Sequence, residues 1–248
     1  MEKICTEDYS VNLVDMADNT EDNKTVNDNP NDAKAISLGT QVYDTVATEL
    51  EQRWYAFSVA KATKFTAAMV MDDTADFDLY VYKLNETDGT LELVGGSAIV
   101  GAGTQELSML KLDEGIYFIG IEAATGNGSF LMYTYAGVND GKEINDTTDL
   151  ASSYVRNSRM TATIDSPFDY DYYKVVISKN DILEYTFDQP TGCDYKVLVY
   201  DGKNYYTINN GTYRLNTGTY YFIVMASSMN YSDDKYYGIK ISKVQIGR

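Results

Sequence analysis

The 248-residue sequence predicts an all-β protein built from two tandem antiparallel β-sandwich domains of a jelly-roll-like kind. Three observations lead to this prediction. Strand patterns dominate the chain, long amphipathic helices are missing, and the same series of sequence blocks occurs twice in the same order. A repeat of about 100 residues has the size of a whole domain, whereas solenoids and propellers repeat every ~20–50 residues.

The duplication is visible in four pairs of blocks. They are 31–36 with 145–150, 53–59 with 171–177, 76–82 with 194–200, and 112–119 with 215–222. The second and third pairs lie 118 positions apart and the fourth lies 103 apart, so the first copy holds 15 extra residues between its last two blocks. We therefore predict a flexible acidic leader at 1–26, domain 1 at 27–138 and domain 2 at 139–248, joined by the polar, glycine-containing stretch 137–142.

Individual strands are recognised by their periodicity. Residues 76–82 alternate between polar and apolar side chains, while 116–121 and 219–224 are short aromatic and β-branched runs that follow a glycine. Asp-Gly and Asn-Gly pairs at 88–89, 127–128, 201–202 and 210–211 are typical of hairpin turns. We expect about seven or eight strands in each domain, with one or two helical turns near 31–36 and 146–151.

The composition excludes several classes of function. A net charge of −17 repels phosphate backbones and anionic lipid, so we expect no nucleic-acid partner. No apolar run approaches the length of a membrane span, and no signal-peptide pattern follows Met1. Histidine is absent, which removes His-based nucleophilic systems, and Cys5 and Cys193 alone cannot form a zinc site. The sequence therefore indicates a protein that is not an enzyme.

The repeated blocks resemble the bacterial pre-peptidase C-terminal domain family, which is related to the collagen-binding domains of clostridial collagenases. The resemblance is carried by 29–33, 76–82 and 112–118, and it covers residues 27–245. It implies a secreted or cell-surface bacterial protein with a non-catalytic role. Such a module would bind an extracellular protein or polysaccharide, or would accompany a neighbouring peptidase domain.

The resemblance also implies a calcium site where the segment that enters each domain meets an acidic loop. Calcium prefers six to eight oxygen ligands, several of them carboxylates. Domain 2 offers Glu143, Asn145, Asp146, Asp165, Asp169 and Asp171. Domain 1 offers a weaker set that includes Asp28 and Asp32 with Glu49 and Glu51. The alternative is that these side chains only cap turns and short helices.

Tyrosine is unusually frequent, with 23 residues of which 15 follow residue 140. Exposed tyrosine rings suit contacts with peptides or sugars, although tyrosine is also an ordinary strand residue. The expected ligand-binding tyrosines are Tyr205, Tyr206, Tyr231, Tyr236 and Tyr237.

Two other functions stay open from the sequence. The protein could be a spacer or a folding and export aid without a ligand. It could also be a carbohydrate-active enzyme, because glycoside hydrolysis uses paired carboxylates. The pairs Asp165 with Asp169 and Glu49 with Glu51 would then be the suspects, although such pairs arise easily in a chain with 37 acidic residues.

Overall fold

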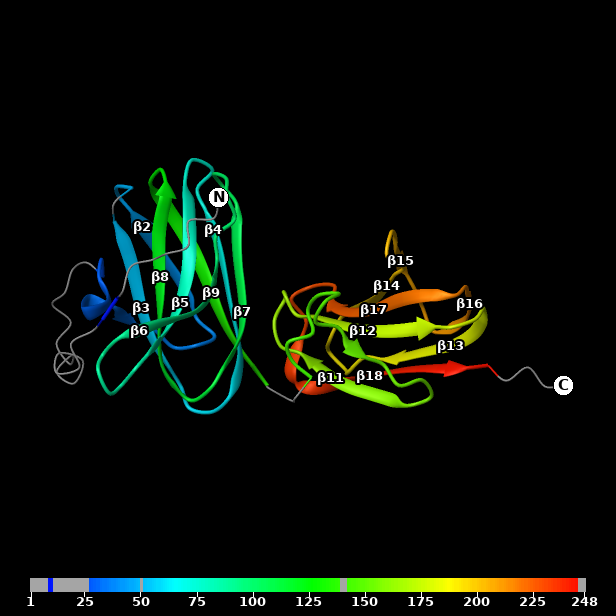
Figure 1. Ribbon diagram of the computed structural model, residues 1–248. Helices are drawn as coiled ribbons and strands as arrows, with labels where there is room; N and C mark the ends of the chain where they lie inside the picture. The colour runs from blue at the N-terminus through cyan, green and yellow to red at the C-terminus, as the bar shows by residue number, and fades with distance from the viewer. Residues whose placement is uncertain (1–8, 11–26, 50, 139–141, 245–248) are drawn as a thin grey trace. The chain divides into compact units, whose positions relative to one another are not determined.

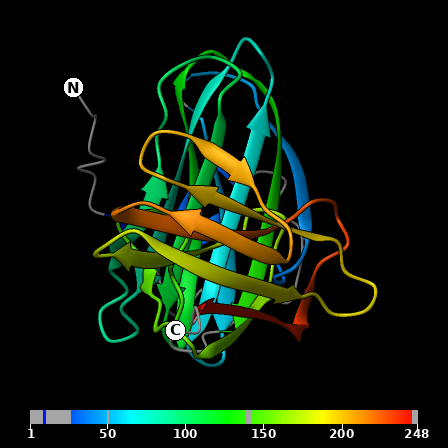
Figure 2. The same ribbon diagram turned by 90° about the vertical axis from the view of Figure 1, so that its right-hand side faces the viewer.

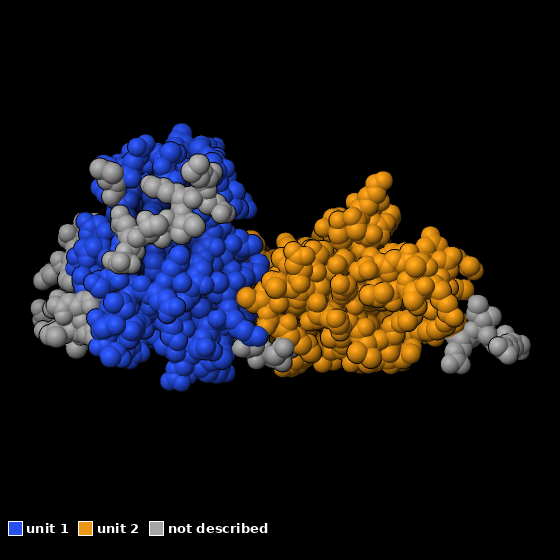
Figure 3. Space-filling model, in the orientation of Figure 1, with its two compact units in different colours: residues 1–136 blue, residues 137–248 orange. Residues whose placement is uncertain are grey.

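The computed structural model describes residues 9–10, 27–49, 51–138 and 142–244. Within these ranges the structure is all-β, as predicted, apart from one 3-10 turn, η1 (Pro30–Asp32). None of the described segments is a helix long and apolar enough to cross a membrane. The chain divides into two compact units, residues 1–136 and 137–248, which are coloured separately in Figure 3.

Unit 1 is a sandwich of two sheets (Figure 1). One sheet has the order β1-β3-β8-β5-β6 and the other β2-β9-β4-β7. The strands are β1 (Lys34–Ala35), β2 (Gln41–Val46), β3 (Gln52–Val59), β4 (Thr63–Met71), β5 (Asp76–Leu84), β6 (Leu91–Ser97), β7 (Gln105–Leu112), β8 (Gly115–Thr125) and β9 (Gly128–Val138).

Unit 2 repeats this arrangement strand for strand (Figures 1 and 2). Its sheets have the orders β10-β12-β17-β14-β15 and β11-β18-β13-β16. The strands are β10 (Ser152–Ser153), β11 (Arg159–Ile164), β12 (Tyr170–Ile177), β13 (Asp181–Asp188), β14 (Tyr195–Tyr200), β15 (Tyr205–Thr207), β16 (Gly211–Leu215), β17 (Gly218–Ala226) and β18 (Ser232–Lys243). In both units the first, two-residue strand pairs in parallel and the other recorded pairs are antiparallel.

The backbone bonds correct one of the sequence alignments. Trp54 N donates to the carbonyl of Asn27 at 2.8 Å, and Tyr172 N donates to that of Asn145 at 3.0 Å. Asn145 therefore corresponds to Asn27, 118 positions earlier, and not to Asn31 as the similar Asn-Asp pairs suggested. The offset of 118 holds from the segment that enters each unit to the fifth strand, β5 in unit 1 and β14 in unit 2.

Two of the four predicted hairpin turns have another role. The Asp88-Gly89 and Asp201-Gly202 turns do join paired strands, β5 with β6 and β14 with β15. The turns at 127–128 and 210–211 instead carry the chain from one sheet to the other. The predicted helical turn at 146–151 is also wrong, because the structure has only bends and turns there.

Each unit has an aromatic core between its sheets. In unit 1 the inner face of β3 contributes Tyr55 and Phe57, and its outer face contributes Trp54 to a second, separate cluster. This outer cluster contains Trp54, Tyr80, Tyr82, Leu84, Leu91 and Phe118. Tyr9, from the predicted leader, packs against it. The other leader residues, except Ser10, lie outside the described part of the chain.

Candidate metal centre

Three carboxylates meet at the start of β12 in unit 2. Glu143, Asp169 and Asp171 each place one carboxylate oxygen within 4.8 Å of the others. The side chains are buried, at 6% exposure for Glu143 and 0% for both aspartates. Charged groups are rarely buried together without a compensating charge, because desolvation and like-charge repulsion both disfavour the ionised forms.

The backbone holds the loop before β12 in a fixed conformation. Asp169 closes it by accepting a hydrogen bond from Asp165 N at 2.7 Å, and Asp169 N donates to the Ser166 carbonyl at 3.2 Å. The segment that enters the unit is tied to the same strand, because Tyr170 N donates to Asp146 Oδ1 at 3.1 Å. Segments on both sides of the cluster are therefore positioned by hydrogen bonds that main-chain N–H groups donate.

Asp171 connects the cluster to the core of the unit. Tyr237 Oη donates to Asp171 Oδ2 at 2.5 Å, and the Tyr173 and Tyr237 hydroxyls lie 2.5 Å apart. Burial, followed by the charges of Asp169 and Glu143, raises the pKa of Asp171 well above its ordinary value, and the hydrogen bond from Tyr237 only partly opposes this. Three buried carboxylates that disfavour one another's ionised forms in this way could hold a metal cation.

The donor set fits a hard divalent cation. It consists of carboxylate oxygens, with the amide side chain of Asn145 adjacent to Asp171, and nitrogen and sulfur ligands do not contribute. Calcium and magnesium prefer such oxygen ligands, and calcium accepts the more irregular arrangements. Of the six residues expected in domain 2, the structure brings Glu143, Asp169 and Asp171 into one ligand group. Asn145, Asp146 and Asp165 are buried in the same region.

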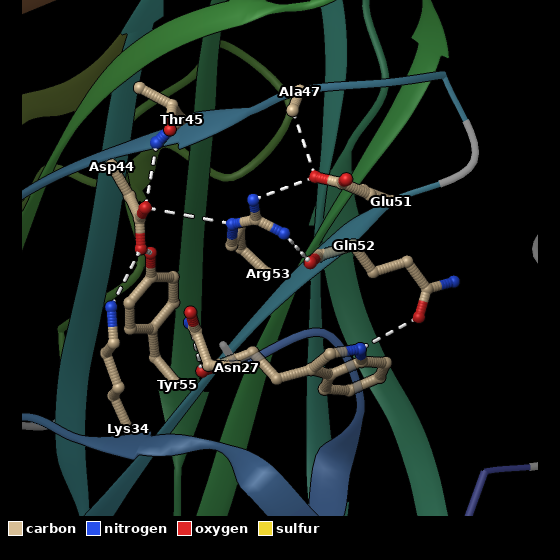
Figure 4. A network of polar contacts seen from close by, with 10 residues as sticks. Asn27, Lys34, Asp44, Thr45, Ala47, Glu51, Gln52, Arg53 and Tyr55 are labelled. Atoms are coloured by element: carbon tan, nitrogen blue, oxygen red, sulfur yellow. Dashed lines mark hydrogen bonds and ion pairs between the residues drawn. The ribbon is translucent and has the colours of Figure 1, made fainter. Parts of the chain in front are cut away.

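The equivalent place in unit 1 holds an arginine. Arg53 stands 118 positions before Asp171 and is likewise the second residue of its strand, opposite Ile121 in β8. Its side chain is only 8% exposed. Arg53 Nη2 lies 2.9 Å from Glu51 Oε2, and its Nε lies 3.7 Å from Asp44 Oδ1 (Figure 4). The guanidinium is therefore a permanent cation in the acidic loop of unit 1.

The rest of the unit 1 loop matches unit 2. Glu51 accepts a hydrogen bond from Ala47 N at 3.0 Å, as Asp169 does from Asp165 N. This bond, together with Arg53, lowers the pKa of Glu51. Burial raises the pKa of Asp44, but hydrogen bonds from Tyr55 and Thr45 outweigh it, so that the net shift is downward.

Asp28 and Asp32, the candidate ligands of domain 1, take part in a helix cap. Asn29 caps η1, and its Nδ2 lies 3.0 Å from Asp28 Oδ1 and 2.6 Å from Asp32 Oδ2. Neither aspartate belongs to the carboxylate group found among the described residues. Both aspartates therefore support the capping residue Asn29 by accepting hydrogen bonds from its side-chain amide.

The expected ligand-binding tyrosines separate into two groups. Tyr205, Tyr206 and Tyr236 are 58%, 49% and 57% exposed, and Tyr231 is partly buried. Tyr237 was expected at the surface, and this is wrong. It is fully buried, because side chains alternate along β18 and Tyr237 takes the inward position next to Tyr236.

The paired carboxylates suggested for glycoside hydrolysis lie in different surroundings. Asp165 and Asp169 are 5% and 0% exposed and are bound to each other through Asp165 N. Glu51 is held by Arg53, and Glu49 Oε1 accepts from Gly126 N at 3.0 Å. Neither pair faces a sugar-sized opening within the described cavities, whose walls are formed by other residues of unit 2.

Comparison with known proteins gives similarity of structure at low sequence identity. No family model and no curated protein matches the sequence. The pre-peptidase C-terminal domain of a collagenase from Bacillus anthracis is similar over 41% of this chain and 93% of its own, at 16% identity and a TM-score of 0.36. The human MASP-1/3 CUB1-EGF-CUB2 fragment covers 82% of this chain and 99% of its own, at 8% identity and a TM-score of 0.28. A fucolectin from striped bass serum covers 82% and 85%, at 10% identity and a TM-score of 0.21.

Proposed function

We propose that this protein is a non-catalytic binding module whose second unit is stabilised by calcium. The observation that carries the proposal is the buried group of Glu143, Asp169 and Asp171, at a position where unit 1 carries Arg53. One copy of the fold neutralises its acidic loop with a side chain. The other copy has an aspartate there and needs a cation from solution.

The proposed role is that of an accessory module in a secreted or cell-surface protein. Calcium at millimolar concentration outside cells would keep such a site filled. The exposed tyrosines of unit 2 would contact an extracellular polymer, a protein or a polysaccharide, and a neighbouring peptidase domain is a second possible partner. A spacer without any ligand is the alternative, and it predicts no specific contact at these tyrosines.

Calcium should raise the melting temperature of unit 2. A ligand that binds only the folded state stabilises it by about 2.7 kcal/mol at a hundredfold excess over Kd. For a unit of this size, each kcal/mol shifts the melting temperature by about 4–8 °C. We therefore expect a rise of about 10 °C or more in saturating calcium, measured by circular dichroism, and a matching binding isotherm by calorimetry.

The Asp171→Asn variant should abolish the calcium response. The amide keeps the size of the side chain and removes one buried charge, so we expect the variant to fold and to melt no lower than the parent in chelator. Asp32→Asn in unit 1 is the matched control and should keep the full response. A calcium-induced rise that survives Asp171→Asn, or the lack of any rise in the parent protein, would refute the site.

A further inference from the structure

The second feature of interest is the outer face of the five-stranded sheet in each unit. In unit 1 this face carries the Trp54 cluster, and Tyr9 and Ser10 lie against it. Tyr9 lies with its ring 4.7 Å from that of Trp54 and 5.5 Å from that of Tyr82. Leu91 N donates to the Tyr9 carbonyl at 2.8 Å, and Ser10 forms a β-bridge with Thr90. These two residues thus join the sheet edge, and Tyr9 inserts one aromatic ring.

The same face of unit 2 carries aromatic rings at the matching positions. Tyr172 replaces Trp54, Tyr200 replaces Tyr82, and Tyr221 replaces Phe118. The registers agree, because Tyr82 lies opposite Phe118 in unit 1 and Tyr200 lies opposite Tyr221 in unit 2. We call Tyr172, Tyr200, Tyr205 and Tyr221 the tyrosine platform.

The platform is a coherent surface. The rings of Tyr200 and Tyr205 stack with centroids 4.5 Å apart, and Tyr221 follows at 6.2 Å from Tyr200. Burial and the adjacent Tyr205 raise the pKa of Tyr172 to about 12. The hairpin of β14 and β15, which carries Tyr200 and Tyr205, projects from unit 2 in Figure 3. Tyr172, Tyr200 and Tyr221 are each partly exposed.

The charge around the platform is reversed between the units. In unit 1, Asp78 and Glu122 lie opposite each other on this face, and the Tyr9 hydroxyl donates to Glu122 at 2.8 Å. Lys196 and Met225 form the corresponding pair in unit 2. Lys174, opposite Tyr221, adds a second positive charge.

The position of Lys174 in unit 1 is occupied by Ala56, opposite Phe118. Lys174 and Lys196 therefore favour an acidic ligand on the unit 2 face more than Asp78 and Glu122 do on the unit 1 face.

The geometry points to the tyrosine platform as the docking site for an extended acidic peptide that presents one aromatic side chain. The inference rests on the proposed binding role and names its partner class. Unit 1 shows how such a segment is seated, with a backbone bond at the sheet edge and a ring on the aromatic cluster. Strand addition at an exposed edge is a general mode of peptide recognition, and β15 is the edge strand of this sheet in unit 2.

The probe is a synthetic peptide with the sequence of residues 6–14, in which two acidic residues precede a tyrosine. It is titrated into the full chain, labelled at isoleucine and leucine methyl groups, and followed by NMR. We expect saturable shifts at Ile223 and Leu198, which lie opposite each other on the platform's face of the sheet, in register with Tyr172. A peptide with alanine in place of the tyrosine should bind at least tenfold more weakly.

Protein variants locate the site. Tyr205→Ala should weaken binding at least fivefold, and Lys174→Ala, which copies unit 1, should weaken it and reduce its dependence on salt. Tyr236→Ala, at an equally exposed tyrosine of β18 in the other sheet, should leave binding unchanged within twofold.

Three outcomes would overturn the inference. They are the lack of a methyl shift at millimolar peptide, equal binding of the alanine peptide, and shifts confined to Leu84 and Leu91 of unit 1. The titration is repeated with calcium and with chelator. A missing calcium effect on melting would refute the metal site alone and leave the methyl result as an independent finding.

Discussion

The acidic loops of the two units show how one backbone can carry opposite electrostatic solutions. Both loops close with a carboxylate that accepts a hydrogen bond from the main chain four residues earlier, at 3.0 Å in unit 1 and 2.7 Å in unit 2. Two residues further on, unit 1 has Arg53 and unit 2 has Asp171. Unit 1 has a cation built into the chain, whereas unit 2 has three clustered carboxylates that could hold a metal.

The largest expected difference between the units is in their response to pH without calcium. The folded-state pKa of Asp171 is raised, so the folded unit 2 binds more protons than the unfolded one, and its stability falls as pH rises through that pKa. Asp44 and Glu51 have lowered pKa values, so unit 1 loses their contribution only as pH falls below the ordinary carboxyl range. We expect unit 2 to melt lower at pH 8 than at pH 5.

The single tryptophan makes this comparison measurable. Trp54 fluorescence follows unit 1 alone, whereas circular dichroism follows both units. Burial raises the pKa of Asp78, so the stability of unit 1 also falls as pH rises, but less steeply than that of unit 2. Asp171→Asn should make the melting temperature of unit 2 nearly independent of pH in this range. An equal pH dependence of melting in both units would contradict the difference proposed between their acidic loops.

An intermediate effect is expected from Arg53→Ala in unit 1. The buried stem of Arg53 is lost, and the Gln52 carbonyl loses a donor that lies 2.7 Å away. Together these changes should lower the free energy of unfolding by about 2–3 kcal/mol. Chemical denaturation followed by Trp54 fluorescence measures the change. Arg53→Met keeps much of the stem and should cost less, and calcium should rescue neither variant.

The fold was predictable because its signals are local and occur twice. Alternation at 76–82 and the apolar runs at 116–121 and 219–224 lie within β5, β8 and β17. The carboxylates of unit 2 were expected together because the resemblance to the pre-peptidase C-terminal family implies that the segment entering the unit meets the acidic loop. They group together because the acidic loop leads directly into β12 and the segment that enters the unit is hydrogen-bonded to the same strand.

Other features depend on partners distant in the sequence. Aligning the sequence blocks 53–59 and 171–177 shows that Arg53 and Asp171 occupy equivalent positions. The role of the arginine depends on Asp44, which comes from another strand and is not visible in that alignment. Periodicity shows that one of Tyr236 and Tyr237 faces inward, and only the register of β18 decides which one. The contact between the rings of Tyr9 and Trp54 is not predicted by any pattern in the sequence.

The smallest effect is expected from Tyr237→Phe, which copies Phe130 of unit 1. Phe130 lies opposite Asp44 in β2, and Tyr237 lies opposite Ala162 in β11. Asp44 and Ala162 are equivalent positions, 118 residues apart, so Phe130 and Tyr237 are equivalent as well. The change keeps the packing and removes the hydrogen bond to Asp171, so we expect a loss of about 1–2 kcal/mol. Denaturation in calcium, followed by circular dichroism, measures it. Tyr236→Phe should have no effect, and an equal loss there would argue against a role for this bond.

The chain of hydrogen bonds that links Asp171, Tyr237 and Tyr173 has a consequence for spectroscopy. A phenol that donates to a carboxylate absorbs at a different wavelength when that carboxylate is protonated or neutralised by an ion. Tyr237 lies in the dry core, between Phe187 and Tyr195. Its near-ultraviolet band is therefore an internal reporter of the charge at the loop. Unit 1 has phenylalanine at this place, and its own partly buried phenol–carboxylate pair, Tyr55 with Asp44, adjoins Arg53 and not the proposed calcium site. A calcium difference spectrum therefore reads unit 2 without any added label.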